Sequence, residues 1–332
     1  MTEVVAGYDA VLFDLDGVVY LGPEPVPGAA EGIARLRDRN VPVGFVTNNA
    51  ARAPQAVVDH LNALGIPCTD QEVVTAGQAG VLMLTQELPA GASVLVCGSP
   101  ALVEQVRDAG FAVALSADDH PDAVIQGYFP ELGWPTLTEA ALAVQRGARW
   151  FATNLDPSRP TDRGLEPGAG AQIAAVRLVV GGEPRAAGKP DKPLMLAATA
   201  RLGAERPIFV GDRLDTDIAG GINSGLDTML VFTGSHRAPE LFDAVPSQRP
   251  DHVGRDLRDL LAPVRTVSLS DGRARCGDAS VHLEDGRVRI DAPGDAMDLV
   301  WATARLVWDV RDAGGVADPG QVLEAVAGEL AR

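Results

Sequence analysis

The feature that most constrains this chain's fold is an alternation of short apolar runs with amphipathic stretches of helical length. Residues 10–13 are typical of a buried strand, 27–39 of a helix, 43–46 of a second strand, and 54–64 of a helix that ends at Gly65. This alternation predicts an α/β fold with a parallel, doubly wound sheet.

An interruption of this alternation predicts an inserted domain. The first rhythm fills residues 1–80 and returns in 185–262, while residues 81–184 carry a separate series of strands and helices. We therefore expect a host domain made of the two outer segments and an inserted α/β domain between them.

The last seventy residues or so have a different character. Asp-Gly pairs at 271–272 and 285–286 separate alternating segments, which predicts hairpins, and Trp301 and Trp308 share one face of a later helix. We expect residues 263–332 to form a small α+β appendage with both tryptophans in its core. It faintly resembles a fragment of an acetyltransferase-like fold but lacks the coenzyme A loop, so packing or dimerisation is the expected role.

Charge and cysteine content limit the partners. The formal net charge of -17 argues against nucleic acid or an anionic membrane surface, because both require clustered Lys and Arg. The three cysteines have neither disulfide-framework nor zinc-site spacing, which favours a reducing compartment. No signal-peptide pattern opens the chain, and no apolar run approaches the roughly 20 residues of a membrane span. We predict a cytoplasmic protein.

Acidic residues follow two of the predicted strands. Asp14 and Asp16 come at the end of the first strand, and a cluster containing Asp212 and Asp217 follows the strand at 208–210. In open α/β sheets, ligands bind at the carboxyl ends of the strands, where these residues are expected to lie. Neighbouring carboxylates repel unless a cation lies between them or one is protonated, so the pattern predicts a divalent metal, with Asp16 as a general acid/base. Gly17 allows a turn and offers its N–H to an anion.

Two further segments supply groups suited to phosphate. Thr47 and Asn48 follow the second strand and can donate hydrogen bonds to phosphate oxygens, and the Lys189 ammonium can balance their charge. Each of these short segments, taken alone, also fits an ordinary turn or helix cap. The segments all occur in this order, with a long insertion between Asn48 and Lys189, and such a combination is improbable by chance.

Together these segments resemble the motifs of the haloacid dehalogenase superfamily. Asp14-Leu-Asp16-Gly17-Val18, Thr47-Asn48-Asn49, Lys189 and Gly211 through Asp217 match its four motifs in order over residues 8–262. The resemblance is to class IIA phosphatases, which have a large C2-type α/β cap and include NagD-like, p-nitrophenyl phosphatase-like and phosphoglycolate phosphatase-like enzymes. Residues 152–156 and 167–170 also resemble that cap.

The resemblance implies a mechanism. Asp14 would be the nucleophile that becomes the aspartyl phosphate, and Asp16 the general acid/base. Mg²⁺ would be held by Asp14, the Asp16 carbonyl and Asp212, with Asp217 supporting the coordination shell. Phosphoryl oxygens would be held by Thr47 and Lys189, assisted by the backbone N–H groups of Gly17 and Asn48.

The cap departs from the family pattern around Tyr128, where relatives more often have a small apolar residue and an acid. The candidates for contact with the leaving group are Tyr128, Asn154, Asp156, Arg159 and Arg163. The alternative is that Asn154 and Asp156 cap local turns and that the two arginines are solvated.

The expected substrate is a small phosphorylated metabolite of the glycerol 3-phosphate or phosphoglycolate type. Pyridoxal phosphate and nucleoside monophosphates are the alternatives. A non-catalytic regulatory relative is disfavoured because Asp14, Asp16 and Lys189 are all present. A nucleotide-binding dehydrogenase is excluded because Asp-Leu-Asp-Gly follows the first strand where Gly-x-Gly-x-x-Gly would be required. A homodimer is possible.

Overall fold

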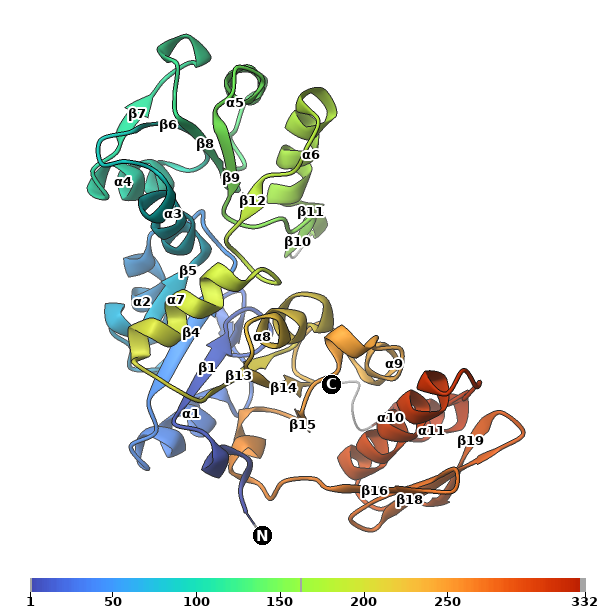
Figure 1. The fold of residues 1–332 in the computed structure, drawn as a ribbon. Helices are drawn as coiled ribbons and strands as arrows, with labels where there is room; N and C mark the ends of the chain where they lie inside the picture. Colours follow the sequence, from blue (N-terminus) through green and yellow to red (C-terminus); the bar gives the residue numbers. More distant parts are fainter. Residues whose placement is uncertain (1, 162, 329–332) are drawn as a thin grey trace. The chain divides into compact units, whose positions relative to one another are not determined.

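The computed structural model describes residues 2–161 and 163–328 (Figure 1). It divides into two compact units, the first made of residues 1–43 and 205–332 and the second of residues 44–204. The domain boundaries predicted from the sequence, after residues 80, 184 and 262, do not coincide with this division and stay predictions.

The first unit contains parallel strands in the order β15-β14-β13-β1. These are β1 (Ala10–Asp14), β13 (Pro207–Gly211), β14 (Asp227–Val231) and β15 (His252–Gly254). Every residue of β1 and β13 is buried. Burial on both faces explains why these strands are continuous apolar runs in the sequence. The predicted α/β class with parallel strands is confirmed.

Short elements surround these strands. The helices are α1 (Ala29–Arg37), α8 (Ala219–Asn223) and α9 (Ala238–Phe242), and a π-helical turn spans Leu214–Ile218. A two-stranded hairpin is formed by β2 (Tyr20–Leu21) and β3 (Glu24–Pro25). The carboxyl ends of β1, β13 and β14 lead into loops that carry polar residues.

The second unit contains a parallel pair, β4 (Val43–Thr47) with β5 (Val73–Thr75), and a five-stranded parallel sheet in the order β12-β9-β8-β6-β7. The sheet strands are β6 (Ser93–Cys97), β7 (Ala112–Ala114), β8 (Ala123–Gln126), β9 (Arg149–Ala152) and β12 (Arg185–Ala186). Its helices are α2 (Pro54–Ala63), α3 (Ala76–Glu87), α4 (Pro100–Asp108), α5 (Trp134–Gln145), α6 (Ala169–Val180) and α7 (Lys192–Leu202). A hairpin of β10 (Ser158–Thr161) and β11 (Gly164–Pro167) follows β9.

The C-terminal appendage belongs to the first unit. Its antiparallel sheet consists of β16 (Val267–Ser270), β17 (Arg273–Cys276), β18 (Ala279–Glu284) and β19 (Arg287–Ala292), followed by α10 (Ala296–Asp312) and α11 (Gly320–Val326). The predicted hairpin is confirmed, because Leu283 pairs with Val288 across a turn in which Asp285 and Gly286 have φ of 47° and 74°. Such left-handed values are what a type I′ turn requires.

The appendage shares a hydrophobic core with the rest of its unit. Trp301 and Trp308 are 1% and 5% exposed, which confirms the prediction that they are core residues. The same cluster contains Leu230 at the end of β14 and Phe242 of α9. The appendage is therefore packed against the parallel-sheet region through a continuous apolar interface, which stabilises both.

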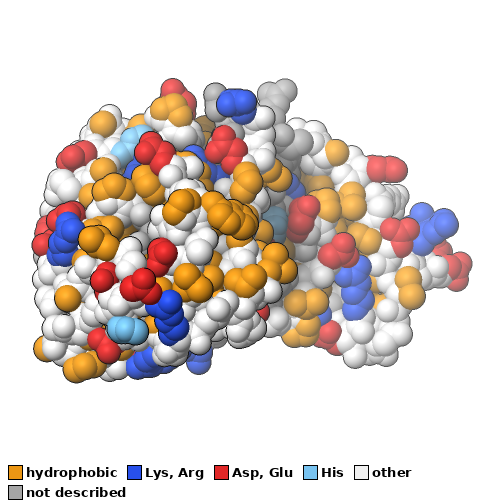
Figure 2. Space-filling view, turned by 90° about the horizontal axis from the view of Figure 1, so that it is seen from above, with side chains coloured by type: hydrophobic (Ala, Val, Ile, Leu, Met, Phe, Trp, Pro, Cys, Tyr) orange, Lys and Arg blue, Asp and Glu red, His pale blue; other side chains and the backbone are white. Residues whose placement is uncertain are grey.

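The helices and one face of the surface can be described by their apolar and charged side chains. Among residues 2–161 and 163–328, no helix combines the length and apolar character needed to cross a membrane. Acidic and basic side chains are interspersed on the face seen in Figure 2, with hydrophobic side chains gathered between them.

Candidate active site

Three buried carboxylates meet at the carboxyl ends of two neighbouring strands. Asp14 is the last residue of β1, Asp212 directly follows β13, and Asp217 lies in the π-helical turn after it. One oxygen from each lies within 4.8 Å of the others, and exposure of the three residues is 7% or less. Buried carboxylates this close repel each other unless a cation lies between them or one of them is protonated. An all-oxygen set of this kind fits Mg²⁺, a hard cation that binds a few carboxylates and keeps several waters.

The loop after β1 is tightly wound. The Leu15 carbonyl accepts the N–H groups of Val19 and Tyr20, at 2.9 and 3.1 Å, and Asp16 is exposed beside the buried Asp14. Exposure suits a residue that must exchange protons with a leaving group and with water.

Gly17 has a different role from the one predicted. Its N–H donates to the Tyr20 carbonyl at 2.8 Å, so this group closes the loop and is not offered to an anion. The residue must be glycine because its φ is 91° and a Cβ would lie 2.6 Å from Asp212 Oδ2. Gly17 therefore allows the loop to approach the Asp212 carboxylate.

The turn after β13 is organised by Asp217. Its Oδ2 accepts the backbone N–H groups of Asp212 and Arg213, at 3.0 and 3.1 Å. A Cβ on Gly211 would lie 2.2 Å from the Asp217 Cβ, so the strand end and the turn are in close contact. π-Helical turns occur frequently at functional sites. Here the turn lets Asp217 position the backbone of Asp212 while its own carboxylate faces the other two.

A segment that the sequence reasoning missed completes this part of the site. Residues 233–236, here called the 233–236 loop, follow β14. The Ser235 N–H donates to Asp212 Oδ2 at 2.5 Å and the His236 N–H to the Asp212 carbonyl at 3.1 Å. The Thr233 hydroxyl donates to the Gly17 carbonyl at 2.6 Å. The rule that located the other segments, polar residues directly after a buried strand, would have found this one too.

His236 also holds the π-helical turn from the side. Its Nδ1 accepts the Leu214 N–H at 2.9 Å, and its Nε2 lies 4.0 Å from an Asp215 carboxylate oxygen. Within the 233–236 loop, a Cβ on Gly234 would lie 2.0 Å from Asp212 Oδ2. The backbone of this loop thus packs closely against the Asp212 carboxylate, and the His236 side chain holds the neighbouring turn.

In the second unit, the Asn48 side chain joins three segments. Its Oδ1 accepts the Lys189 N–H at 2.8 Å, and its Nδ2 donates to the Lys189 carbonyl at 3.1 Å and to both carboxylate oxygens of Asp156, at 3.1 and 3.2 Å. Thr47 and Lys189 are 2% and 3% exposed. The Asn48 side chain therefore holds the backbone of Lys189, while the use of the Asn48 backbone N–H for phosphate stays a prediction.

Asn154 and Asp156 belong to the same network. The Asn154 Nδ2 donates to the Asn48 carbonyl at 2.7 Å, and its Oδ1 accepts the Asp156 N–H at 3.1 Å. A Cβ on Gly188 would lie 2.8 Å from the Asn154 Cβ. These bonds agree with the alternative, in which Asn154 and Asp156 stabilise local turns, while contact of either residue with the leaving group stays a prediction.

Two of the remaining cap candidates are brought together. The Arg159 guanidinium lies 5.2 Å from the centre of the Tyr128 ring, and its Nη1 donates to the Tyr128 hydroxyl at 3.2 Å. Arg159 lies in β10, and Arg163 is exposed in the turn that follows. Whether Thr47, Lys189 and these cap residues join the carboxylates in one site stays a prediction.

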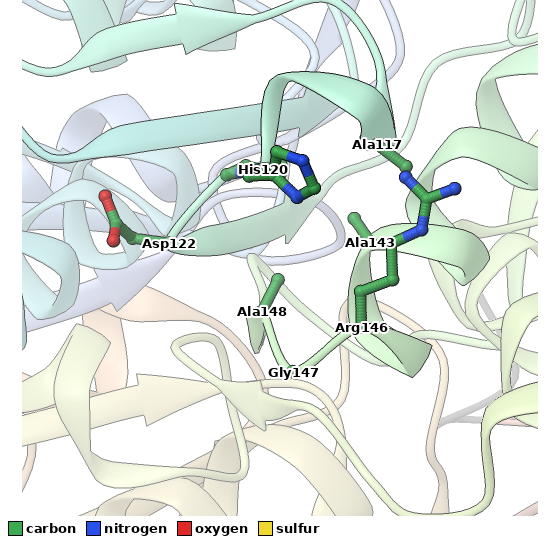
Figure 3. Close-up of a pocket in the computed structure, with 8 residues that line it drawn as sticks. Ala117, His120, Asp122, Ala143, Arg146, Gly147 and Ala148 are labelled. Carbon is green, nitrogen blue, oxygen red and sulfur yellow. The ribbon is translucent and has the colours of Figure 1, made fainter.

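A shallow pocket elsewhere in the second unit does not resemble a catalytic site. It has a volume of about 220 Å³ and contains none of the predicted site residues. In Figure 3 the Asp122 carboxylate and the Arg146 guanidinium lie on opposite sides of it. Arg146 is paired with Asp118 at 2.7 Å, and Asp122 accepts the Ser93 N–H. Its lining residues are Ala117, His120, Pro121, Asp122, Ala143, Arg146, Gly147 and Ala148.

Comparison with known proteins places these features in a family. Residues 11–112 match the model described as haloacid dehalogenase-like hydrolase, and residues 186–260 match the HAD-hydrolase-like model. The first match contains the loop after β1 and the Thr47-Asn48 segment, and the second contains Lys189 and the turn after β13.

Two relatives and one solved structure extend the match. The chain is 39% identical over 322 residues to the D-glycerol 3-phosphate phosphatase of Mycobacterium tuberculosis, covering 94% of this chain and 89% of that protein. It is 35% identical over 248 residues to the 5'-nucleotidase YutF of Bacillus subtilis, covering 74% and 94%. A crystal structure of the glycerol phosphate phosphatase from M. tuberculosis in complex with magnesium superposes with a TM-score of 0.88 at 37% identity, covering 98% of this chain and 99% of that one. The chain therefore belongs to the haloacid dehalogenase-like hydrolases, as a magnesium-dependent phosphatase of the class that carries an inserted α/β cap.

Proposed function

We propose that this phosphatase hydrolyses glycerol 3-phosphate through an aspartyl-phosphate intermediate on Asp14. The observation that carries the chemistry is the buried Asp14 carboxylate at the end of β1, with oxygens of Asp212 and Asp217 within 4.8 Å. The substrate proposal is supported by similarity to a D-glycerol 3-phosphate phosphatase over 94% of this chain, a span that reaches into the appendage.

The proposed reaction has two displacements. The Asp14 carboxylate attacks phosphorus, the bond from phosphorus to the ester oxygen breaks, and that oxygen leaves with its electron pair while Asp16 donates a proton to it. Asp16 then removes a proton from a water molecule that attacks the phosphorus of the aspartyl phosphate. Inorganic phosphate leaves, and the Asp14 carboxylate and protonated Asp16 are regenerated.

The metal would be held by Asp14, Asp212 and the Asp16 carbonyl, with Asp217 supporting Asp212. When bound, Mg²⁺ supplies positive charge to the phosphoryl oxygens, which carry most of the charge in the transition state. Asp217 contributes by fixing the Asp212 backbone through its two hydrogen bonds.

Thr47 and Lys189 are proposed to hold the phosphoryl oxygens. Both side chains are buried, and a buried ammonium interacts more strongly with an anion than an exposed one does. Asn48 serves this function indirectly, because its side chain holds both backbone polar groups of Lys189.

The leaving group is proposed to meet Tyr128, Arg159 and Arg163. A small hydroxylated alcohol needs a few polar donors, which a phenol and two guanidinium groups provide. Nucleoside monophosphates remain the second candidate because the 5'-nucleotidase relative is 35% identical over 248 residues.

Phosphate release from a panel of monoesters tests this proposal. With Mg²⁺, both glycerol 3-phosphate enantiomers, phosphoglycolate, pyridoxal phosphate and nucleoside monophosphates would be compared by kcat/KM. We expect a glycerol 3-phosphate enantiomer to be preferred. A preference for nucleoside monophosphates would overturn the substrate proposal and leave the phosphatase chemistry intact.

Variants test the residue roles. Asp14→Asn is expected to abolish turnover with the fold retained, and Asp16→Asn to slow release of glycerol more than release of nitrophenolate, because nitrophenolate needs no proton to leave. Asp38→Asn, at an exposed acid after α1, is the control and should behave as wild type. Retained turnover in Asp14→Asn would refute the nucleophile assignment.

We further propose that the protein is cytoplasmic, that a homodimer is possible, and that it has no nucleic-acid partner. The net charge of -17 supports the absence of a nucleic-acid partner, since binding to a polyanion requires clustered cations. Size-exclusion chromatography with light scattering would establish whether the protein is a monomer or a dimer.

A further inference from the structure

We propose that the C-terminal appendage is a positioning element for the magnesium site, acting on Asp212 through α9 and the 233–236 loop. The inference rests on the proposed metal-binding role of Asp212. It assigns a function to a region for which the sequence suggested only packing or dimerisation.

The first step is a set of polar contacts from α10 to the carboxyl end of α9. The Trp308 Nε1–H donates to the Leu241 carbonyl at 3.1 Å, and the Arg311 Nη1 donates to the Phe242 carbonyl at 2.7 Å. The second Arg311 nitrogen pairs with Asp243 at 2.8 Å. Figure 1 shows α9 and α10 side by side. Two consecutive carbonyls at the end of α9 are thus held by side chains of α10.

The second step is that α9 depends on this packing. The helix has five residues, and a helix this short has little stability of its own in water. Leu241 and Phe242 are 0% and 1% exposed, and both lie in the apolar cluster that contains Trp308. The position of α9 is therefore determined by the elements that pack against it, and α10 is one of these elements.

The third step leads from α9 to the carboxylate. α9 begins at Ala238, two residues after His236, and the Leu241 N–H donates to the Arg237 carbonyl at 3.1 Å. The Arg237 side chain donates to the Phe232 carbonyl, which closes the 233–236 loop between β14 and α9. Within this loop Ser235 and His236 donate to Asp212. A displacement of α9 is thus transmitted to the Asp212 donors within a few residues.

The metal makes the site sensitive to such a displacement. Mg²⁺ requires near-ideal octahedral geometry with ligand distances of about 2.0–2.1 Å. A carboxylate whose donors shift by a fraction of an ångström therefore binds the ion less well, even if the fold is unchanged. Loosening the contacts between α10 and α9 should reduce Mg²⁺ affinity.

A pair of tryptophan variants on the same helix provides the test. Trp308→Phe and Trp301→Phe each remove one indole N–H that donates to a backbone carbonyl, but the Trp301 acceptor is the Arg265 carbonyl, which is not part of α9. Mg²⁺ binding to the metal-free proteins is measured by calorimetry, and stability by thermal unfolding. We expect Trp308→Phe to bind Mg²⁺ about three- to tenfold more weakly, and Trp301→Phe to bind like wild type at a comparable loss of stability.

A second pair keeps the test valid if the tryptophan variants fold poorly. Arg311→Gln removes the donor to the Phe242 carbonyl, whereas Arg305→Gln removes an exposed guanidinium that stacks 5.5 Å from the Trp301 ring centre. We expect only Arg311→Gln to weaken Mg²⁺ binding. The inference would be overturned if Trp308→Phe and Arg311→Gln both bound Mg²⁺ with wild-type affinity. It would also be overturned if both members of each pair lost the same amount of Mg²⁺ affinity. A wild-type protein that bound no Mg²⁺ would instead refute the proposed metal site.

Discussion

Gly234→Ala tests whether the 233–236 loop positions a metal ligand. A Cβ at this residue would lie 2.0 Å from Asp212 Oδ2 and 2.4 Å from its Cγ. Since a Cβ essentially never approaches another heavy atom within 3.0 Å, the methyl group and the carboxylate must separate by about 1 Å. The Asp212 side chain is 1% exposed and enclosed by backbone, so part of that movement falls on the carboxylate itself.

The expected effect follows from the size of this displacement. A shift of about 1 Å is half of a Mg²⁺–oxygen distance of about 2.0–2.1 Å, which an octahedral site does not tolerate. Misplacement of this size can reduce turnover by about 100-fold. We therefore expect Gly234→Ala to lower kcat/KM by about 100-fold and to weaken Mg²⁺ binding by at least about tenfold, with secondary structure retained.

The assay combines phosphate release, titrated with Mg²⁺, with calorimetric Mg²⁺ binding and circular dichroism. Gly7→Ala is the matched control, because a Cβ there would meet nothing within 4 Å. Wild-type Mg²⁺ affinity and turnover in Gly234→Ala would refute the reasoning, since the Asp212 carboxylate could then move by an ångström without consequence for the metal.

Two further predictions concern other parts of the chain. Asn48→Ala should lower both stability, by about 2 kcal/mol, and kcat/KM, because the Lys189 backbone loses its two hydrogen bonds. The control Asn62→Ala, which loses three side-chain bonds to backbone groups, should lower only the stability measured in urea. Burial lowers the pKa of His252, so its contribution to stability is present above about pH 6.5 and is lost as the pH falls. Wild type should therefore lose more stability than His252→Gln between pH 7.5 and 5.5. Equal losses in the two proteins would show that His252 does not cause the pH dependence.

Local patterns explain how much of the fold could be predicted. The Asp285-Gly286 hairpin was predictable because a type I′ turn requires left-handed residues at two adjacent positions, and Asp-Gly supplies them. The strand ends that carry Asp14 and Asp212 were predictable because buried parallel strands are continuous apolar runs, and ligand-binding residues follow them.

Contacts between distant residues explain what could not be predicted. Asn48 bonds to Asp156 and Lys189, which are 108 and 141 residues away along the chain, and no sequence spacing reveals such a network. A polar residue at a strand end can serve a ligand or another loop, and only the structure distinguished the two for Asn48. The Gly17 N–H differs in that its acceptor, the Tyr20 carbonyl, is only three residues away, and the motif itself does not show that the loop bonds to itself there.

The stability of the metal-free protein offers a separate test of the carboxylate cluster. At 4.8 Å and an effective dielectric constant of about 20, two carboxylates repel each other by roughly 3 kcal/mol, partly offset by donors such as the Ser235 N–H. Folding without a metal must overcome this repulsion. Binding of Mg²⁺ at 100 times its dissociation constant should add about 2.7 kcal/mol, which corresponds to a rise in Tm of roughly 5 °C.

Asp212→Asn separates a metal ligand from a structural acceptor. The asparagine keeps an oxygen for the Ser235 N–H but removes one charge from the cluster, so we expect the metal-free variant to be at least as stable as metal-free wild type and to show no rise in Tm with Mg²⁺. Asp38→Asn should keep the wild-type rise. A metal-free variant that melted several degrees lower, yet was still stabilised by Mg²⁺, would mean that Asp212 serves the 233–236 loop and that the metal is held by other groups.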